Sequence, residues 1–189
     1  MPVSGCALRL RWPCRELLPE YEAALRAGWS PDTERDASAE HLARLRRDPV
    51  EFLADLTRQD GSIATAAGIV PRLPGRIYWL DDGEFCGIIN LRYVPGSERL
   101  PDHVSGHIGY AVVPWKRRRG YATRALALML PVARDVGLFH VEITCDDDND
   151  ASRRVIVNNG GMLTGRRAEP DGRIKLVFRI DLAPRAAPP

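Results

Sequence analysis

The sequence predicts a mixed α/β fold, and three observations support this prediction. Segments with apolar residues at helical spacing alternate along the 189-residue chain with short runs rich in β-branched and aromatic residues. No segment of the chain repeats another. The length suits one domain, which we expect over residues 1–182, because a chain of this size buries roughly 70% of its unfolded surface.

The N-terminal part of the chain predicts one strand and two helical regions. Ala7–Arg11 has the pattern of a short strand, and apolar spacing indicates helices in Glu16–Gly28 and Ser38–Arg58. Pro49 predicts a break or kink in the second region, because proline removes a backbone hydrogen bond. The intervening segment Trp29–Ala37 is polar and contains a proline, so we expect a mobile loop there.

The centre of the chain predicts a β-hairpin followed by a further strand. Arg76–Leu80 and Glu84–Val94 are two β-type runs joined by Asp81-Asp82-Gly83, and such a connection favours a tight turn. Ser105–Val113 has the β-branched and aromatic composition of the next strand. Residues 61–74 carry no pattern from which we assign an element.

The C-terminal part predicts two helices, one strand and a final hairpin. Helical spacing runs from Gly120 to Gly137, where glycine is a natural stop signal, and again over Asn149–Asn159. Phe139–Cys145 between them has strand character. We expect the last hairpin to turn at Pro170-Asp171-Gly172, and residues 183–189 to form a flexible tail.

Composition excludes several classes of function. The net charge of +2 is too small for a nucleic-acid binder, and no stretch interleaves basic and aromatic residues. No run approaches the ~20 apolar residues of a membrane helix, and the four cysteines lack metal-site spacing. We therefore expect a soluble cytoplasmic protein with reduced thiols and no metal. Only two of the 27 basic residues are lysines, Lys116 and Lys175, which we interpret as a bias of genome composition.

The segment Val112–Thr123 carries the strongest functional signal. A short strand, a proline break, three arginines and a glycine lead into a helix. Amides at a helix N-terminus lack intrahelical partners, and the helix dipole adds positive potential there. Arg117, Arg118 and Arg119 reinforce that potential, and Gly120 can adopt backbone angles that other residues avoid. The chain lacks the Walker and dinucleotide glycine motifs, so the pattern predicts a different kind of phosphate or pyrophosphate site.

Two motifs in order carry a family resemblance. Arg117–Ala122 fits Gln/Arg-x-x-Gly-x-Gly/Ala, and Asn149–Ser152, about one helix and one strand later, fits Asn-x-x-Ser/Ala. On these motifs the chain resembles the GNAT superfamily of acyl-CoA-dependent N-acetyltransferases, closely over Ser105–Gly161 and in general outline elsewhere. The resemblance implies a splayed central sheet of about six to seven strands flanked by about four helices. It also implies acetyl-CoA as the co-substrate.

The resemblance further implies which residues bind the co-substrate. Amides of the loop would hold the pyrophosphate, and the preceding strand would line the pantetheine arm through its backbone. The implied cofactor-binding residues are Val112, Val113, Arg117, Arg118, Arg119, Gly120, Tyr121, Ala122, Thr123, Asn149 and Ser152.

The chemistry requires a base, because an amine must lose a proton before or as it attacks a thioester. His107 lies ten residues before Arg117, near the position where some family members place a catalytic carboxylate, and histidine titrates near neutrality. Glu142, on the next predicted strand, is the alternative base. Each also has a structural interpretation, as a histidine satisfied by a local hydrogen bond and as a solvent-facing carboxylate.

No residue is assigned as the general acid. Many family members carry a tyrosine seven residues after the motif asparagine, but the chain has Ile156 there. Free thiols have a pKa of ~8.5, so a thiolate can leave without full protonation. Tyr110 and Tyr121 are close in sequence, but strand alternation does not establish that either points toward the sulfur.

The acidic run Asp146–Asp150 allows two interpretations. Acidic residues before a helix offset its dipole, typically by 0.3–1 kcal/mol each. Alternatively, part of the run borders the acceptor pocket and attracts a cationic amine.

These observations give three functional hypotheses. The first is an N-acetyltransferase that moves an acetyl group from acetyl-CoA to a primary amine by direct attack in a ternary complex. The alternative is a catalytically silent acyl-CoA-binding regulatory module. The third is a protein-interaction domain that has lost the cofactor, and the intact loop Arg117–Ala122 argues against it. The expected partners are acetyl-CoA and a small-molecule or peptide amine, without nucleic acid or membrane, in a monomer or homodimer. Possible acceptor contacts are Trp29, His41, Arg99 and His103.

Overall fold

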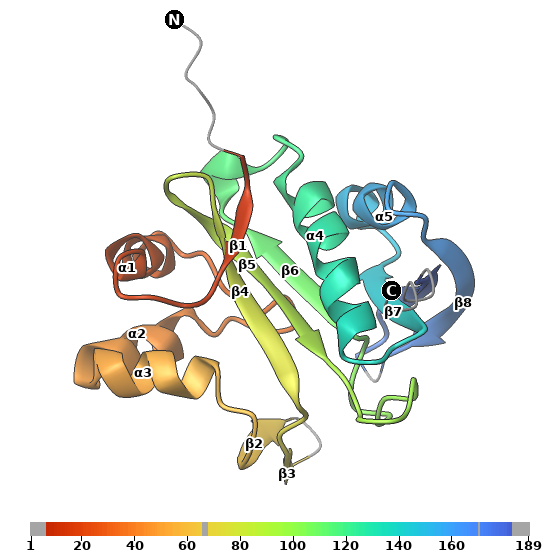
Figure 1. Cartoon of the computed structure of the whole chain (residues 1–189), viewed down its shortest axis with the longest axis horizontal. Coiled ribbons are helices and arrows are strands. Elements are labelled where there is room, and N and C mark those ends of the chain that lie inside the picture. Colours follow the sequence, from red (N-terminus) through yellow and green to blue (C-terminus); the bar gives the residue numbers. More distant parts are fainter. Residues whose placement is uncertain (1–6, 66–67, 170, 183–189) are drawn as a thin grey trace, which may run out of the picture.

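The computed structural model describes residues 7–65, 68–169 and 171–182, and its strands form three sheets (Figure 1). The first sheet has the order β1-β4-β5-β6, namely β1 (Arg9–Arg11), β4 (Gly75–Asp81), β5 (Phe85–Arg92) and β6 (Ile108–Val112). The second has the order β7-β9-β8, namely β7 (His140–Asp146), β9 (Ile174–Asp181) and β8 (Met162–Ala168). A separate hairpin joins β2 (Ser62–Thr65) to β3 (Gly68–Pro71). The helices are α1 (Leu18–Arg26), α2 (Ser38–Arg47), α3 (Pro49–Leu56), α4 (Tyr121–Asp135) and α5 (Asp150–Val157).

The mixed α/β class is confirmed, and the differences from the predicted elements have local causes. The predicted helical region Ser38–Arg58 is two helices, because the Asp48 carboxylate accepts hydrogen bonds from the amides of Val50 and Glu51 and so begins α3. Pro49 is the first residue of that helix, a position where its missing N–H is not needed. The hairpin β2–β3 occupies residues to which the sequence assigned no element. The predicted tail and Pro170 of the predicted last turn lie outside the described residues.

The first sheet separates two hydrophobic clusters, because alternate residues of its strands point to opposite faces. Figure 1 shows α1–α3 on one side of β4 and β5, with α4 and α5 on the other. On the first side, Trp79, Phe85 and Ile88 pack with the buried residues Tyr21, Leu25 and Phe52. On the second side, Leu80, Ile89 and Leu91 pack with Leu126, Met129 and Ile156. Both faces are thus covered, and the sheet is a fixed platform for the loops at its ends.

The two larger sheets meet at one junction. The amide of His107, just before β6, donates to the carbonyl of Glu142 in β7 at 2.7 Å. Beyond this contact β6 pairs only with β5, and β7 pairs only with β9, so the predicted splay of the sheet is present. Among the described residues, no helix has the length and apolar character needed to cross a bilayer.

Candidate functional site

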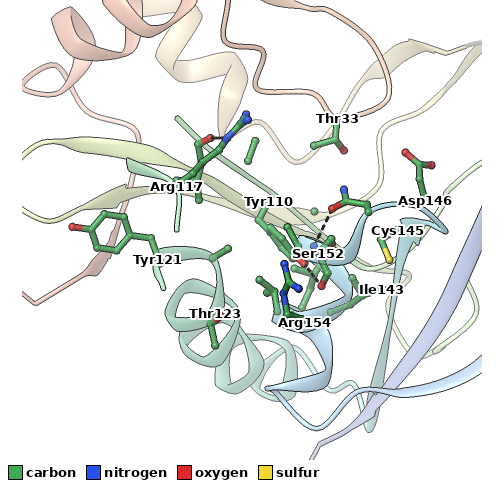
Figure 2. Close-up of a pocket in the computed structure, with 18 of the residues that line it drawn as sticks. Thr33, Tyr110, Arg117, Tyr121, Thr123, Ile143, Cys145, Asp146, Ser152 and Arg154 are labelled. Carbon is green, nitrogen blue, oxygen red and sulfur yellow. Dashed lines mark hydrogen bonds between the residues drawn. The ribbon is translucent and has the colours of Figure 1, made fainter. Parts of the chain in front are cut away.

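A cavity of about 790 Å³ lies where β6 and β7 diverge. Figure 2 shows residues of several regions around it: the α1–α2 loop, β6 with the following loop, the first turn of α4, β7, and the start of α5. The predicted cofactor-binding residues line this cavity, except for two. Val113 is fully buried in the cluster beneath α1–α3, and Arg119 is exposed outside the cavity.

The loop before α4 presents unpaired backbone amides. Gly120 is the N-cap of α4 and has a φ of 77°, in the left-handed region that glycine adopts without strain. In the described part of the chain, no backbone carbonyl accepts a hydrogen bond from the amides of residues 118–123. Arg117 folds back, and its Nε donates to the carbonyl of Val112 at 3.1 Å. Such amides and the helix dipole are the features that an anion site requires, and anion binding by this loop stays a prediction.

A single carboxylate braces this loop from both sides. Asp82, in the turn between β4 and β5, accepts hydrogen bonds from Lys116 Nζ at 3.0 and 3.1 Å and from the Tyr121 hydroxyl. Lys116 precedes the loop and Tyr121 follows it, so one side chain fixes both ends. Burial alone would raise the pKa of Asp82, but the hydrogen bonds from Tyr121 and Lys116, with the positive charge of Lys116, outweigh it and lower the pKa to about 2. The sequence marks Asp82 only as a turn residue, because Lys116 and Tyr121 lie more than 30 residues further along the chain.

Two hydroxyl groups meet inside the cavity. The Tyr110 hydroxyl, from β6, lies 2.8 Å from the Ser152 hydroxyl, from the first turn of α5 (Figure 2). Ser152 is held in turn because its amide donates to the side chain of Asn149, the N-cap of α5. Burial raises the pKa of Tyr110 to about 12, so both hydroxyls are protonated at neutral pH. Ile156, by contrast, is fully buried in the core and does not line the cavity.

His107 lies at the sheet junction, outside the cavity lining. Its side chain is fully buried, and its Nδ1 accepts a hydrogen bond from the amide of Glu142 at 3.0 Å. Burial, together with the nearby His140, lowers the pKa of His107 to about 4, so it is neutral at neutral pH. His107 therefore lacks the open path to the cavity that direct proton transfer needs. Its catalytic role stays a prediction.

Of the remaining residues predicted from the sequence, some line the cavity and others do not. Glu142 is half-buried on β7 and does not line the cavity, so its role as a base also stays a prediction. Of the possible acceptor contacts, Trp29 lines the cavity, whereas His41 accepts or donates a 2.7 Å hydrogen bond with the Tyr21 hydroxyl in the core beneath α1 and α2. Arg99 and His103 do not line the cavity.

The residues of the acidic run divide between the N-terminus of α5 and the cavity, and attraction of a cationic amine stays a prediction. Asn149 caps α5 and Asp150 lies in its first turn, where it pairs with Arg153. Asp146 instead lines the cavity, with Glu34 of the α1–α2 loop and Lys175 of β9. Lys175 Nζ lies 2.7 Å from a Glu34 oxygen and 3.1 Å from an Asp146 oxygen. The sequence analysis did not identify Glu34, because nothing in the local sequence marks its distant partners.

The comparison with protein families decides the classification. A family model described as an acetyltransferase (GNAT) domain matches residues 8–162. The chain belongs to the GNAT acetyltransferase family. This membership confirms the resemblance drawn from the two motifs. None of the curated proteins matches the sequence significantly.

Solved GNAT structures share the fold at low sequence identity. An acetyltransferase from Salmonella typhimurium that modifies the N-terminal serine of ribosomal protein L7/L12 is 14% identical, with 96% of this chain and 97% of that chain covered and a TM-score of 0.63. Mycobacterium smegmatis RimJ, solved with CoA-disulfide, is 22% identical over 92% and 81%, with a TM-score of 0.62. The microcin C7 self-immunity acetyltransferase MccE, solved with acetyl-CoA and AMP, is 13% identical over 95% and 93%, with a TM-score of 0.58.

Asp82 provides a first test of the GNAT loop geometry. Replacing Asp82 with alanine removes the brace on both sides of the loop, so we expect affinity for inorganic pyrophosphate to fall roughly tenfold, or about 1.4 kcal/mol. Phosphorus NMR titration measures this affinity. Glu84→Ala is the matched control, because exposed Glu84 contacts Lys116 but not Tyr121. Equal losses in the two variants would contradict a special role for Asp82.

His107 provides a test based on pH. Its pKa is depressed in the folded protein relative to the ordinary 6.5, so its contribution to stability is complete above pH 6.5 and is lost as pH falls toward 4. His107→Asn keeps an acceptor for the Glu142 amide but does not titrate. We expect the variant's unfolding free energy, measured by urea denaturation, to depend on pH less steeply in this window, by up to about one proton.

His140→Asn is the control, because His140 is the neighbouring histidine. If His140→Asn flattened the pH dependence of the unfolding free energy equally, the effect could not be assigned to His107.

Proposed function

We propose that this protein transfers an acetyl group from acetyl-CoA to the primary amine of an acceptor, by direct attack within a ternary complex. The observation that carries the proposal is the row of unpaired amides at residues 118–123, which opens onto the cavity between β6 and β7. A pyrophosphate accepts several hydrogen bonds, and unpaired backbone amides are suitable donors. A helix N-terminus that follows a left-handed glycine supplies such amides. Acetyl-CoA bound there supplies an activated thioester carbonyl carbon.

Residues of this chain fit the parts of acetyl-CoA. The loop before α4 and the first turn of α4, residues 117–123, would hold the pyrophosphate, with Arg117 and Arg118 adding positive charge. The β6 edge that faces β7 has no strand partner among the described residues beyond the junction, so the backbone groups of Tyr110 and the amide of Val112 would pair with the pantetheine amides. The Val112 carbonyl already accepts from Arg117 Nε. No group of histidine, cysteine or acidic residues within the described ranges is arranged to hold a metal ion.

The acceptor would enter beside the α1–α2 loop. Trp29 and Glu34 from this loop line the cavity, as does Asp146 at the end of β7. The family relatives named above include an enzyme that modifies a protein N-terminus and one that confers self-immunity to microcin C7. A peptide amine and a small-molecule amine are therefore the two classes to screen.

The hydroxyl pair is the part of the site suited to proton transfer. The Tyr110 and Ser152 hydroxyls remain protonated at neutral pH and line the same cavity, so we assign them the protonation of the departing thiolate. His107 and Glu142 keep their proposed role as base, and each would act through a water molecule because neither lines the cavity.

Calorimetric titration tests acetyl-CoA binding and the role of the loop together. We expect micromolar binding of acetyl-CoA and of desulfo-coenzyme A. Gly120→Leu should weaken both at least about tenfold, because a side chain at a φ of 77° strains the backbone by roughly 1–2 kcal/mol and displaces the loop amides. Gly160→Leu is the matched control, since Gly160 has a φ of 83° and lies outside the cavity.

Equal losses in the two glycine variants, or no binding by the unmodified protein, would contradict the loop assignment. Release of free thiol that depends on an added amine then separates the enzyme from a silent module. Binding without such release, across both classes of amine, would favour the regulatory alternative.

The hydroxyl pair gives a kinetic prediction. Tyr110→Phe and Ser152→Ala should each lower kcat for thiol release roughly tenfold or more, because a proton donor contributes about 10²–10⁴ to such rates. The double variant should lose little beyond the worse single variant, since the two hydroxyls act as a unit. Tyr78→Phe is the control, because Tyr78 packs against Trp12 away from the cavity. Unchanged kcat in Tyr110→Phe and Ser152→Ala would remove the pair from the mechanism.

A further inference from the structure

Both lysines of this chain line the cavity proposed to bind acetyl-CoA. The remaining basic residues are arginines, whose guanidinium groups stay charged and are poor nucleophiles. Lys116 and Lys175 come from distant parts of the sequence, yet both are buried at the cavity wall. An amine in that position could accept the acetyl group in place of the substrate. The side chain therefore has to be kept from reacting with acetyl-CoA.

Lys175 sits in a cluster of four charges. It is only 4% exposed, and its Nζ contacts Glu34 at 2.7 Å and Asp146 at 3.1 Å. Arg173, two residues earlier on the chain, contacts the same two carboxylates at 3.5 and 3.3 Å. The two carboxylates come from the α1–α2 loop and from β7, so the cluster joins three separate segments around one ammonium group.

The position of Glu34 is fixed by its own loop. The Ser30 hydroxyl donates to the carbonyl of Asp32 and accepts from the amides of Asp32 and Ala37. The expected mobile loop is therefore tied together at its centre, and it carries Glu34 across the cavity to β9. The folded loop thus places Glu34 where it can pair with Lys175. The Ser105 hydroxyl also donates to Glu34, in a longer contact of 3.5 Å.

The protonation of Lys175 depends on these partners. Burial by itself lowers the pKa of a lysine and favours the neutral amine, which is the nucleophilic form. Burial does act on Lys175, but the hydrogen bonds that its ammonium donates to Glu34 and Asp146 outweigh it, and the pKa of Lys175 is raised. Lys116 shows the same arrangement at the other end of the cavity, with Asp82 and Glu84 as its partners.

We propose that Glu34 and Asp146 protect Lys175 from acetylation by the acetyl-CoA in the cavity, by holding its side chain as an ammonium ion. This inference rests on the proposed function. Without the two carboxylates, the ammonium loses a proton to solvent and the Nζ lone pair attacks the thioester carbonyl carbon. An amide C–N bond forms, the C–S bond breaks with its electron pair on sulfur, and the second amine proton passes to the thiolate. The products are acetyl-lysine and the free thiol of coenzyme A.

Acetylation at Lys175 would also disrupt the site. The neutral amide cannot pair with Glu34 and Asp146, which would then share Arg173 alone. The connection between the α1–α2 loop and β9 would weaken on the side of the cavity assigned to the acceptor. Protection of Lys175 thus preserves the acceptor side of the site through many turnovers.

The test is peptide mass mapping after incubation with acetyl-CoA in the absence of an acceptor. The double variant Glu34→Gln/Asp146→Asn should gain one acetyl group at Lys175 at least about tenfold faster than the unmodified protein, because each unit of lowered pKa raises the neutral fraction tenfold. Adding Lys175→Arg to the double variant should abolish that gain. The single variants should give intermediate rates, and they decide the question if the double variant does not fold.

Acetic anhydride without acetyl-CoA gives a second readout. The ratio of Lys175 to Lys116 labelling within one molecule should rise in the double variant by a similar factor. Asp171→Asn is the matched control, since Asp171 pairs with Arg173 and not with Lys175. That control should leave the ratio unchanged.

Two results would overturn the inference: acetylation of Lys175 in the unmodified protein as fast as in the variants, or no gain in folded variants that bind acetyl-CoA. A failure of acetyl-CoA to bind would instead overturn the proposed function. In that case the anhydride ratio still decides whether the two carboxylates suppress the reactivity of Lys175.

Discussion

The junction between His107 and Glu142 is the constraint on which the site depends. The His107 amide donates to the Glu142 carbonyl, and the Glu142 amide donates to His107 Nδ1, so β6 and β7 are fastened at one point. Beyond it each strand pairs only with its own sheet, and their facing edges separate. A buried, neutral histidine suits this position because it offers an acceptor without a charge. The cavity exists because the two sheets are joined here and nowhere further along.

Paired charges hold the loops that close the two ends of this cavity. At the end proposed to bind pyrophosphate, Asp82 ties Lys116 to Tyr121. At the other end, Glu34 and Asp146 hold Lys175. Each of these lysines is buried and lies against two carboxylates. The negative charges of the carboxylates stabilise the ammonium ion, which burial alone would disfavour. The enzyme thus uses its two lysines to fasten loops while keeping both in the unreactive ammonium form.

The sequence predicted the parts of the site that are local in the chain. Gly120 and the start of α4 were predicted because a left-handed turn, free amides and an amphipathic helix follow one another within about a dozen residues. Asn149 as a cap was predicted for the same reason. His107 was predicted from its place on a strand, but its burial was not, because the residues that cover it come from another sheet. The pairing of Glu34 with Lys175 spans most of the chain and leaves no local pattern.

The sequence by itself determined the fold class, the family and the backbone geometry of the loop before α4, because these depend on periodicity and on motifs of adjacent residues. Only the tertiary structure decided which side chains face the cavity. It moved Val113 and Arg119 out of the lining and placed Tyr110 against Ser152. It also placed both lysines of the chain at the cavity. The reason is physical: burial and the partners of a charge are set by segments far apart in sequence, and these meet only when the sheets and loops are packed.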